Sequence, residues 1–163
     1  MRILIQLIII LAFGQSFAQV AIGKSTVDGS ALLDFGSGTT NGIILPATTS
    51  ITNPANGTFT LDKTTNRVRM YQNGVWVDLS QTADTSGLYS NSGTDTGSGV
   101  LMGAPVSSAQ GVLVLESPRL ALVLPKVADP EINVKSPYPG MICYDTTSDS
   151  IAIFDGVYWN YWK

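Results

Sequence analysis

The chain has 163 residues, of which only 13% are charged, and its 9 Lys and Arg against 12 Asp and Glu give a formal net charge of −3. It contains no histidine, which removes the commonest general base, the Ser-His and Cys-His nucleophile pairs and most zinc and copper sites. A carboxylate pair that hydrolyses glycosides is left open, but neither Glu116 nor Glu131 has a recognisable acid/base spacing. An acidic chain without Lys or Arg clusters repels phosphate backbones. We therefore expect no enzymatic activity, no cofactor, no metal site and no nucleic-acid partner.

Residues 1–18 have the composition of a secretory signal peptide. A positive residue precedes an apolar stretch, residues 3–13, and the small residues Ser16 and Ala18 stand where a signal peptidase requires them. The stretch is shorter than the roughly 20 residues that span a bilayer, so a retained anchor is the weaker interpretation. We expect a mature chain that begins at Gln19, with 145 residues, a net charge of −4 and no membrane span. It would be secreted to the extracellular space or cell surface, with the periplasm as an alternative.

The mature sequence contains two copies of one β-rich unit, residues 19–79 and residues 100–163. Residues 62–76 read against residues 145–159 without a gap, at a constant offset of 83. Further upstream the offset lies between 79 and 83, so the copies differ by small loop insertions. Tandem copies of a short β-rich unit are typical of a modular building block that gains its core by stacking or association. We predict an all-β fold of two tandem units.

The first half of each unit contains short apolar runs bounded by Gly, Ser and Pro. These runs predict buried strands, although their length is also compatible with a helical turn. They are residues 32–35, 43–45, 112–115 and 120–124. Pro46 and Pro125 end them, because proline cannot donate to a sheet ladder. Residues 47–53 and 126–136 follow, and each is equally compatible with a short helix and with irregular structure.

Each unit ends in a predicted three-stranded antiparallel meander. The first two strands are residues 58–61 and 67–71 in the first unit, and residues 141–144 and the strand around Ile151 in the second. In the strand 67–71, Val68 and Met70 share one face and arginines occupy the other, so we expect the face of Val68 and Met70 to be buried.

Two kinds of turn connect the meander strands. Positive-φ turns are predicted before each last strand. They are formed by the pairs Asn73, Gly74 and Asp155, Gly156. The earlier loops, residues 62–66 and 145–149, are rich in oxygen ligands but lack the Gly and the distal Glu of an EF-hand. We interpret the first Asp of each loop as an acceptor of backbone N–H bonds, with calcium binding as the weaker alternative.

Residues 80–99 separate the two units. Ser, Thr and Gly make up 13 of these 20 residues, a composition that predicts a flexible or extended connector. Leu88 and Tyr89 are its only sizeable apolar side chains and are candidates for one short strand.

The single cysteine, Cys143, excludes an internal disulfide. It stands in the middle of a predicted strand and aligns with Thr60 of the first unit, so we expect a packed residue rather than a nucleophile. An intermolecular disulfide is the minor alternative.

Aromatic side chains concentrate in the closing hairpins. Trp76 and Trp159 each follow another aromatic residue by five positions, which favours cross-strand packing. If exposed instead, they would stack on sugar rings as carbohydrate-binding modules do. Trp162 has no counterpart in the first unit and is the better candidate for a contact surface. The candidate contact or ligand-stacking residues are Trp76, Trp159, Trp162, Tyr158 and Tyr161.

A series of motifs runs through each unit. The first unit has an opening Val-x-Ile-Gly at residues 20–23, Ala31-Leu-Leu-Asp34, a Leu-Pro, a Pro-x-x-Gly, a closing Asp-x-Thr-x-Asn and then Tyr-x-Asn-Gly-x-Trp. This series resembles short repeat-bearing secreted surface proteins of Bacteroidetes-type bacteria, and its opening motif is similar to β-repeats of phage tail fibres. The resemblance implies a surface-associated, non-catalytic role, and the fibre relatives imply homotrimers.

We therefore predict a non-catalytic secreted structural or adhesive component of the bacterial cell envelope or extracellular matrix. The alternative is a soluble carbohydrate-binding protein that uses exposed Trp and Tyr. A unit of about 60 residues buries only roughly 60% of its unfolded surface, and no disulfide compensates. Neither unit is therefore expected to be stable alone. The expected partner is the chain itself, with a trimer favoured, and glycans or other envelope proteins are further candidates.

Overall fold

The fold is nearly all β, which confirms the expected class. The computed structural model describes residues 19–88, 97 and 99–163. Strands account for 37% of the described residues and helix for 3%. The predicted signal peptide, residues 1–18, and residues 89–96 and 98 of the predicted connector lie outside the described residues.

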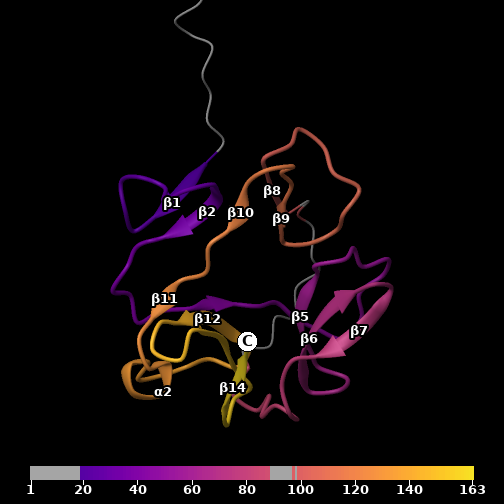
Figure 1. Cartoon of the computed structure of the whole chain (residues 1–163). Helices are drawn as coiled ribbons and strands as arrows, with labels where there is room; N and C mark the ends of the chain where they lie inside the picture. Colours follow the sequence, from indigo (N-terminus) through magenta and orange to yellow (C-terminus); the bar gives the residue numbers. More distant parts are fainter. Residues whose placement is uncertain (1–18, 89–96, 98) are drawn as a thin grey trace, which may run out of the picture.

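The described strands form four sheets (Figure 1). One sheet has the order β4 (Ala47–Thr48), β5 (Phe59–Asp62), β6 (Arg67–Gln72) and β7 (Val75–Asp78). A second has the order β11 (Lys126–Val127), β12 (Met141–Asp145), β13 (Ser150–Phe154) and β14 (Trp159–Trp162), with β3 (Ile43–Ile44) paired to β12. The third contains β1 (Val20–Ile22), β2 (Ala31–Phe35) and β10 (Ala121–Leu122), and the fourth contains β8 (Val100–Met102) and β9 (Leu113–Leu115).

Segments that match in sequence also match in strand pairing. β5, β6 and β7 pair antiparallel in chain order, and so do β12, β13 and β14. Phe59 lies opposite Met70 in the first set, and Ile142 lies opposite Ile153 in the second, 83 residues further on. In both sets one short strand, β4 or β11, joins the first meander strand in parallel. The opening strands agree as well, because β1 on β2 and β8 on β9 are parallel pairs in equivalent registers.

The turns before the last strands differ between the two meanders. Asn73 and Gly74 form a two-residue turn with φ of 50° and 80°, the conformation that a tight hairpin requires. The second turn is longer than the expected two residues, because four residues separate β13 from β14. The buried Asp155 carboxylate organises it by accepting bonds from the amides of Val157 (2.9 Å) and Tyr158 (2.8 Å). Only Gly156, with φ of 103°, has a positive φ there.

A single hydrophobic cluster lies between the two meanders. Its buried members are Leu61, Val68, Leu79, Ala83, Ile142 and Ile153. Val68 is fully buried and Met70 packs against the same cluster, so the predicted inward face of β6 is confirmed. The pairing of β3 with β12 adds a strand from the first half of the chain to the sheet of the second. Each meander therefore buries much of its apolar surface against the other meander.

The start of the predicted connector is part of this packing. Ala83 belongs to the shared cluster and Leu88 packs against it. The Ser80 hydroxyl accepts a bond from the Val68 amide at 3.0 Å, and the Asp84 amide donates to the Asp155 carbonyl at 2.9 Å. Residues 80–88 therefore run along the folded body, although their composition predicts a flexible or extended segment.

A short helix, α2 (Pro130–Asn133), distinguishes the two meanders. Nine residues separate β11 from the Pro-x-x-Gly motif at Pro137, four more than separate β4 from the same motif at Pro54, and α2 lies within that longer segment. Residues 47–53 contain no helix. The outer face of β12 and β13 packs into a second cluster that includes residues on both sides of α2. Its members are Val127, Val134, Met141, Cys143, Ala152 and Phe154, with Tyr138 and Trp159 packed against them.

The equivalent outer face of β5 and β6 is polar. Thr60 and Arg69 occupy the register positions that Cys143 and Ala152 hold in the second meander. The Thr60 and Thr48 hydroxyls are 2.9 Å apart, so each has the hydrogen-bond partner that a buried polar group requires. Arg69 lies 2.9 Å from both Asp62 and Asp78. In the first meander, hydrogen bonds and ion pairs thus stand where the second meander has the apolar layer that the segment around α2 completes.

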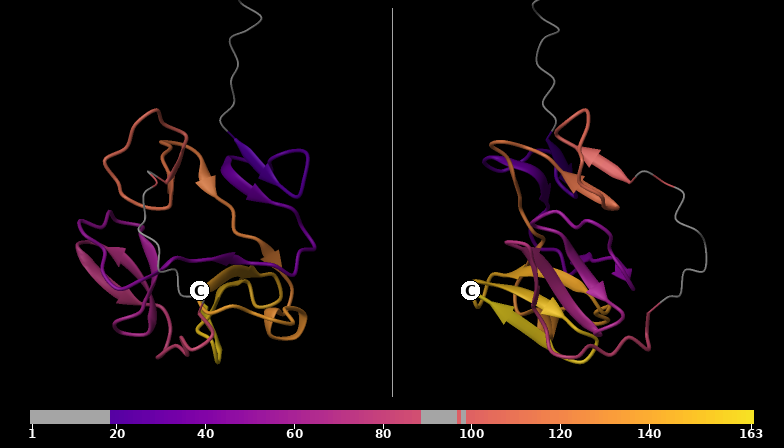
Figure 2. Two further views of the ribbon diagram at one scale, coloured as in Figure 1. Left: turned by 180° about the vertical axis from the view of Figure 1, so that it is seen from behind. Right: turned by 90° about the vertical axis from the view of Figure 1, so that its right-hand side faces the viewer.

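The strands β1, β2, β8, β9 and β10 gather at the end of the molecule opposite the meanders (Figure 2). β2 is the most buried of them, with Ala31, Leu32 and Leu33 at most 2% exposed. Its Asp34 carboxylate accepts bonds from the Asp28 amide (2.8 Å) and the Lys24 ammonium (2.6 Å), which together lower the pKa of Asp34. Large apolar side chains on β8, β9 and β10 are more exposed than those on β2.

Candidate functional site

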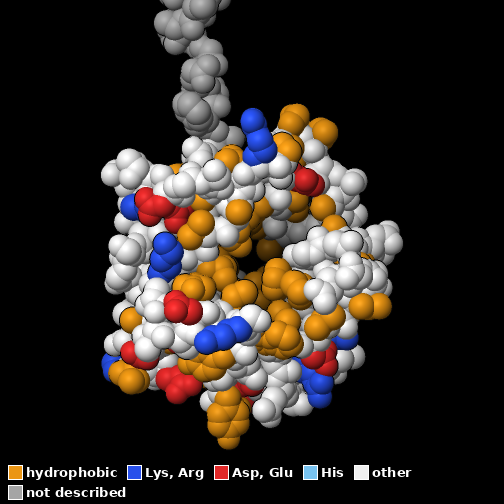
Figure 3. Space-filling view, viewed as in Figure 1, with side chains coloured by type: hydrophobic (Ala, Val, Ile, Leu, Met, Phe, Trp, Pro, Cys, Tyr) orange, Lys and Arg blue, Asp and Glu red, His pale blue; other side chains and the backbone are white. Residues whose placement is uncertain are grey.

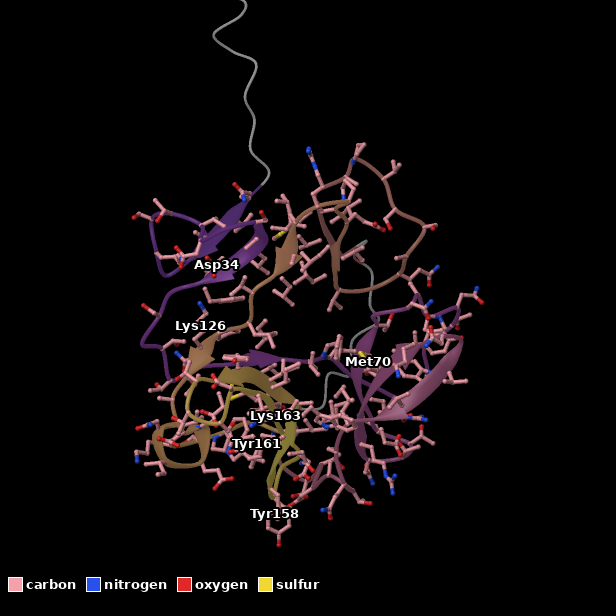
Figure 4. The ribbon with its side chains drawn as sticks, in the orientation of Figure 1. Asp34, Met70, Lys126, Tyr158, Tyr161 and Lys163 are labelled. Carbon is pink, nitrogen blue, oxygen red and sulfur yellow. The ribbon has the colours of Figure 1, made fainter. Side chains whose placement is uncertain are left out.

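The five predicted contact residues do not converge on one site. Trp76 lies on the outer face of β7, and Trp159 packs into the second cluster. Tyr158 projects from the lower end of the molecule, where it is 66% exposed (Figure 4). Tyr161 and Trp162 are neighbours on β14, so their side chains point to opposite faces of the sheet.

Trp76 is engaged in cross-strand packing. Its ring contacts Tyr71 edge to face, with the centroids 5.2 Å apart. The Arg69 guanidinium lies 5.6 Å from the centroid of the Trp76 ring. The half-buried indole of Trp76 is therefore already in contact with an aromatic ring and a cation.

Trp159 occupies the equivalent position on the other meander. It lies opposite Phe154, with the ring centroids 5.3 Å apart. Because it also packs against the second cluster, its ring has more apolar surroundings than that of Trp76. The geometry of both residues fits the packing interpretation better than sugar stacking.

Tyr161 ties β14 to the segment that contains α2. Its hydroxyl donates to the Glu131 carboxylate at 3.0 Å. Burial, and then this hydrogen bond, raise the pKa of Tyr161 above its ordinary value. The Tyr161 hydroxyl is therefore already engaged in a hydrogen bond within the fold.

Trp162 and its neighbour Tyr161 border a groove. The Trp162 indole N–H donates to the Leu79 carbonyl at 2.6 Å, and the side chain stays 42% exposed. The groove measures about 290 Å³ and is lined by Asp78, Leu79, Ser80, Gln81, Asn160, Tyr161 and Trp162. The sequence indicates Trp162 and Tyr161 as candidates but gives no signal for residues 78–81, which carry no motif and come from the middle of the chain.

The two aspartate loops are capped hairpin loops, as the sequence predicts. Asp62 accepts a bond from the Thr64 amide, and Asp145 accepts one from the Thr147 amide. Burial alone would raise the pKa of Asp145, but the Ser148 hydroxyl and the Thr147 amide outweigh it and hold the pKa below its usual value. Within the described residues, no group of three or more metal-ligating side chains comes together.

Cys143 is fully buried in the second cluster. Burial, and then the charge of Asp145, raise the pKa of its thiol to about 12. Because the thiolate is the reactive form, we expect no reaction with an aromatic disulfide reagent at pH 8 in the folded protein and one equivalent of reaction in urea. A spectrophotometric thiol count checks this. Rapid reaction of the folded chain would contradict the packed position and favour the intermolecular disulfide.

A hollow bordered by apolar side chains opens on one face of the molecule (Figure 3). The elements around it in that view are β3, β9 and β10, which carry the exposed residues Ile44, Leu113 and Leu122 (Figure 1). Contiguous exposed apolar surface marks sites of interaction with proteins, membranes or ligands.

Comparison with known proteins gives no outside guide to function. No family model matches the chain, and no curated protein or solved structure matches it significantly. None of the helices in the described part of the chain is long and apolar enough to cross a membrane. Function therefore has to follow from the chain's own surfaces.

Proposed function

We propose that this chain is a non-catalytic, secreted structural or adhesive component of a bacterial envelope or extracellular matrix, and that it works by self-association. One observation carries the proposal: β8, β9 and β10 leave large apolar side chains exposed on short strands. Val100 and Leu113 are 52% and 40% exposed, and Leu122 is 41% exposed.

The same strands have open edges. β8 and β9 form a sheet of only two strands, which is marginally stable in water without further packing. No Lys, Arg or Pro interrupts β8, β9 or β10, and these are the residues that normally discourage strands from pairing between chains. Association with another copy would both cover the apolar surface and satisfy the edges.

We further propose that the chain consists of two tandem units whose meanders pack on each other within one chain. The equivalent registers of the meanders and of the opening strands support this division. Because the shared cluster already covers the inner faces of the meanders, we assign contacts between chains to the end that contains β8, β9 and β10. A trimer is the stoichiometry that the resemblance to fibre repeats favours. Secretion is proposed from the sequence of residues 1–18 alone.

Light scattering coupled to size exclusion tests the proposal on the chain beginning at Gln19. We expect the mass of three chains over a wide concentration range. A charge at the proposed interface costs several kcal/mol when it is buried unpaired, so Leu113→Lys and Leu122→Lys should each yield the mass of one chain.

Val75→Lys is the matched control, because Val75 is a similarly exposed apolar residue on the distant strand β7. It should leave the mass unchanged. The mass of a single wild-type chain at every concentration would overturn the self-association proposal.

A further inference from the structure

We propose that the groove between the end of β7 and β14 binds one ring of a neutral saccharide. The groove is formed by residues 78–81 on one side and residues 160–162 on the other. This site is independent of self-association, which we assign to the opposite end of the molecule.

Trp162 supplies a stacking surface with a fixed orientation. The bond from its indole N–H to the Leu79 carbonyl, 2.6 Å long, joins the two walls of the groove. A side chain held in this way loses little conformational freedom when a ligand binds. With 42% of it exposed, the indole can offer an apolar surface to the C–H face of a sugar. Trp76 and Trp159 are less suited because their rings pack against other side chains.

Polar groups border this indole. The Gln81 side-chain amide is exposed and has no hydrogen-bond partner among the described residues, while its backbone amide lies 3.4 Å from the Asn160 side-chain oxygen. A free amide offers both a donor and an acceptor, which is the pairing that a ring hydroxyl requires. Asp78 adds a carboxylate whose orientation is fixed by ion pairs with Arg67 and Arg69.

The charge and the size of the groove limit the class of ligand that it can bind. The Asp78 carboxylate is balanced by its two arginine partners, and no Lys or Arg lines the groove. The groove therefore has no unbalanced charge to attract a phosphate, a sulfate or a carboxylate. At about 290 Å³, it lies at the lower limit of the small-molecule range. One neutral ring with an apolar face and hydroxyl groups fits these properties better than an anion or an extended peptide.

Nuclear magnetic resonance titration of the full mature chain with methyl glycosides of glucose, galactose, mannose and N-acetylglucosamine tests the proposal. We expect at least one glycoside to cause a saturable shift of the Trp162 indole N–H and Gln81 side-chain amide signals at millimolar concentrations. The indole signals of Trp76 and Trp159 should stay in place.

Two variants link the response to the groove. Gln81→Ala removes an exposed amide that the fold does not use, and it should weaken binding about fivefold, as expected for the loss of one hydrogen bond. Gln72→Ala removes an exposed amide on the β6 hairpin and should leave the affinity unchanged. The amide spectrum of each variant confirms that it is folded. The proposal is overturned if no glycoside gives a saturable shift, or if Gln81→Ala binds as tightly as the wild-type chain.

Discussion

Residues 19–88 and residues 99–163, produced as separate fragments, should each be unfolded, and mixing them should restore a folded complex. The two meanders share one cluster, in which Leu61 and Val68 come from the first fragment and Ile142 and Ile153 from the second. Burial of each such side chain contributes about 1.5–3 kcal/mol. Losing the shared cluster therefore removes an amount comparable to the whole stability of a small domain, about 5–15 kcal/mol.

Backbone pairing gives the same expectation. Separation leaves β12 without β3 and β2 without β10, so each fragment also exposes strand edges that are paired in the intact chain. Circular dichroism and the dispersion of amide signals check the fragments singly and at equimolar ratio. A cooperative melting transition in either isolated fragment would contradict a shared core and would indicate that each unit is an independent domain.

The parts of this fold that the sequence predicts are those specified by local signals. The alternation of Val68 and Met70 with arginines defines the buried face of β6, and the Asn73-Gly74 pair defines its turn. Both signals lie within a few residues of the structure that they specify. The all-β class follows from the same short-range patterns.

The parts that could not be predicted depend on contacts between distant segments. Nothing in residues 43–44 indicates that they pair with β12, about 100 residues away, because a short apolar run carries no information on its partner. The composition of residues 80–88 predicts a flexible or extended connector, yet Ala83 is buried in the cluster shared by the two meanders. The sequence left a short helix within residues 126–136 as one of two alternatives, and α2 lies in that range, but its position beside the second cluster could not be predicted.

The groove illustrates the same limit for the candidate site. Trp162 was identifiable from its lack of a counterpart in the first copy, but its partner is a backbone carbonyl of Leu79, which no side-chain pattern reveals. The opposite wall, residues 78–81, belongs to the end of the first meander and the predicted connector. Only the packing of the meanders brings these two segments together.

Gly156→Ala should destabilise the chain far more than Gly74→Ala, although both glycines lie in turns before the last meander strand. A methyl group at Gly156 would lie 2.3 Å from the Asp84 carbonyl oxygen, and φ there is 103°. At Gly74 the φ is 80°, but a methyl group would meet no atom within 4 Å. The substitution at Gly74 therefore carries only the cost of a positive φ, about 1–2 kcal/mol.

At Gly156 the obstructing atom is backbone, so the turn and the segment around Asp84 would have to separate. That movement breaks the bond between the Asp84 amide and the Asp155 carbonyl and pulls at Ala83, which is buried next to it in the shared cluster. Adding about 1 kcal/mol for the hydrogen bond and a similar amount for lost packing gives a total of about 3–4 kcal/mol. Urea unfolding monitored by tryptophan fluorescence measures both variants. Equal losses would mean that residues 83–84 do not hold the two meanders together, and the shared core would then rest on the cluster side chains and β3 alone.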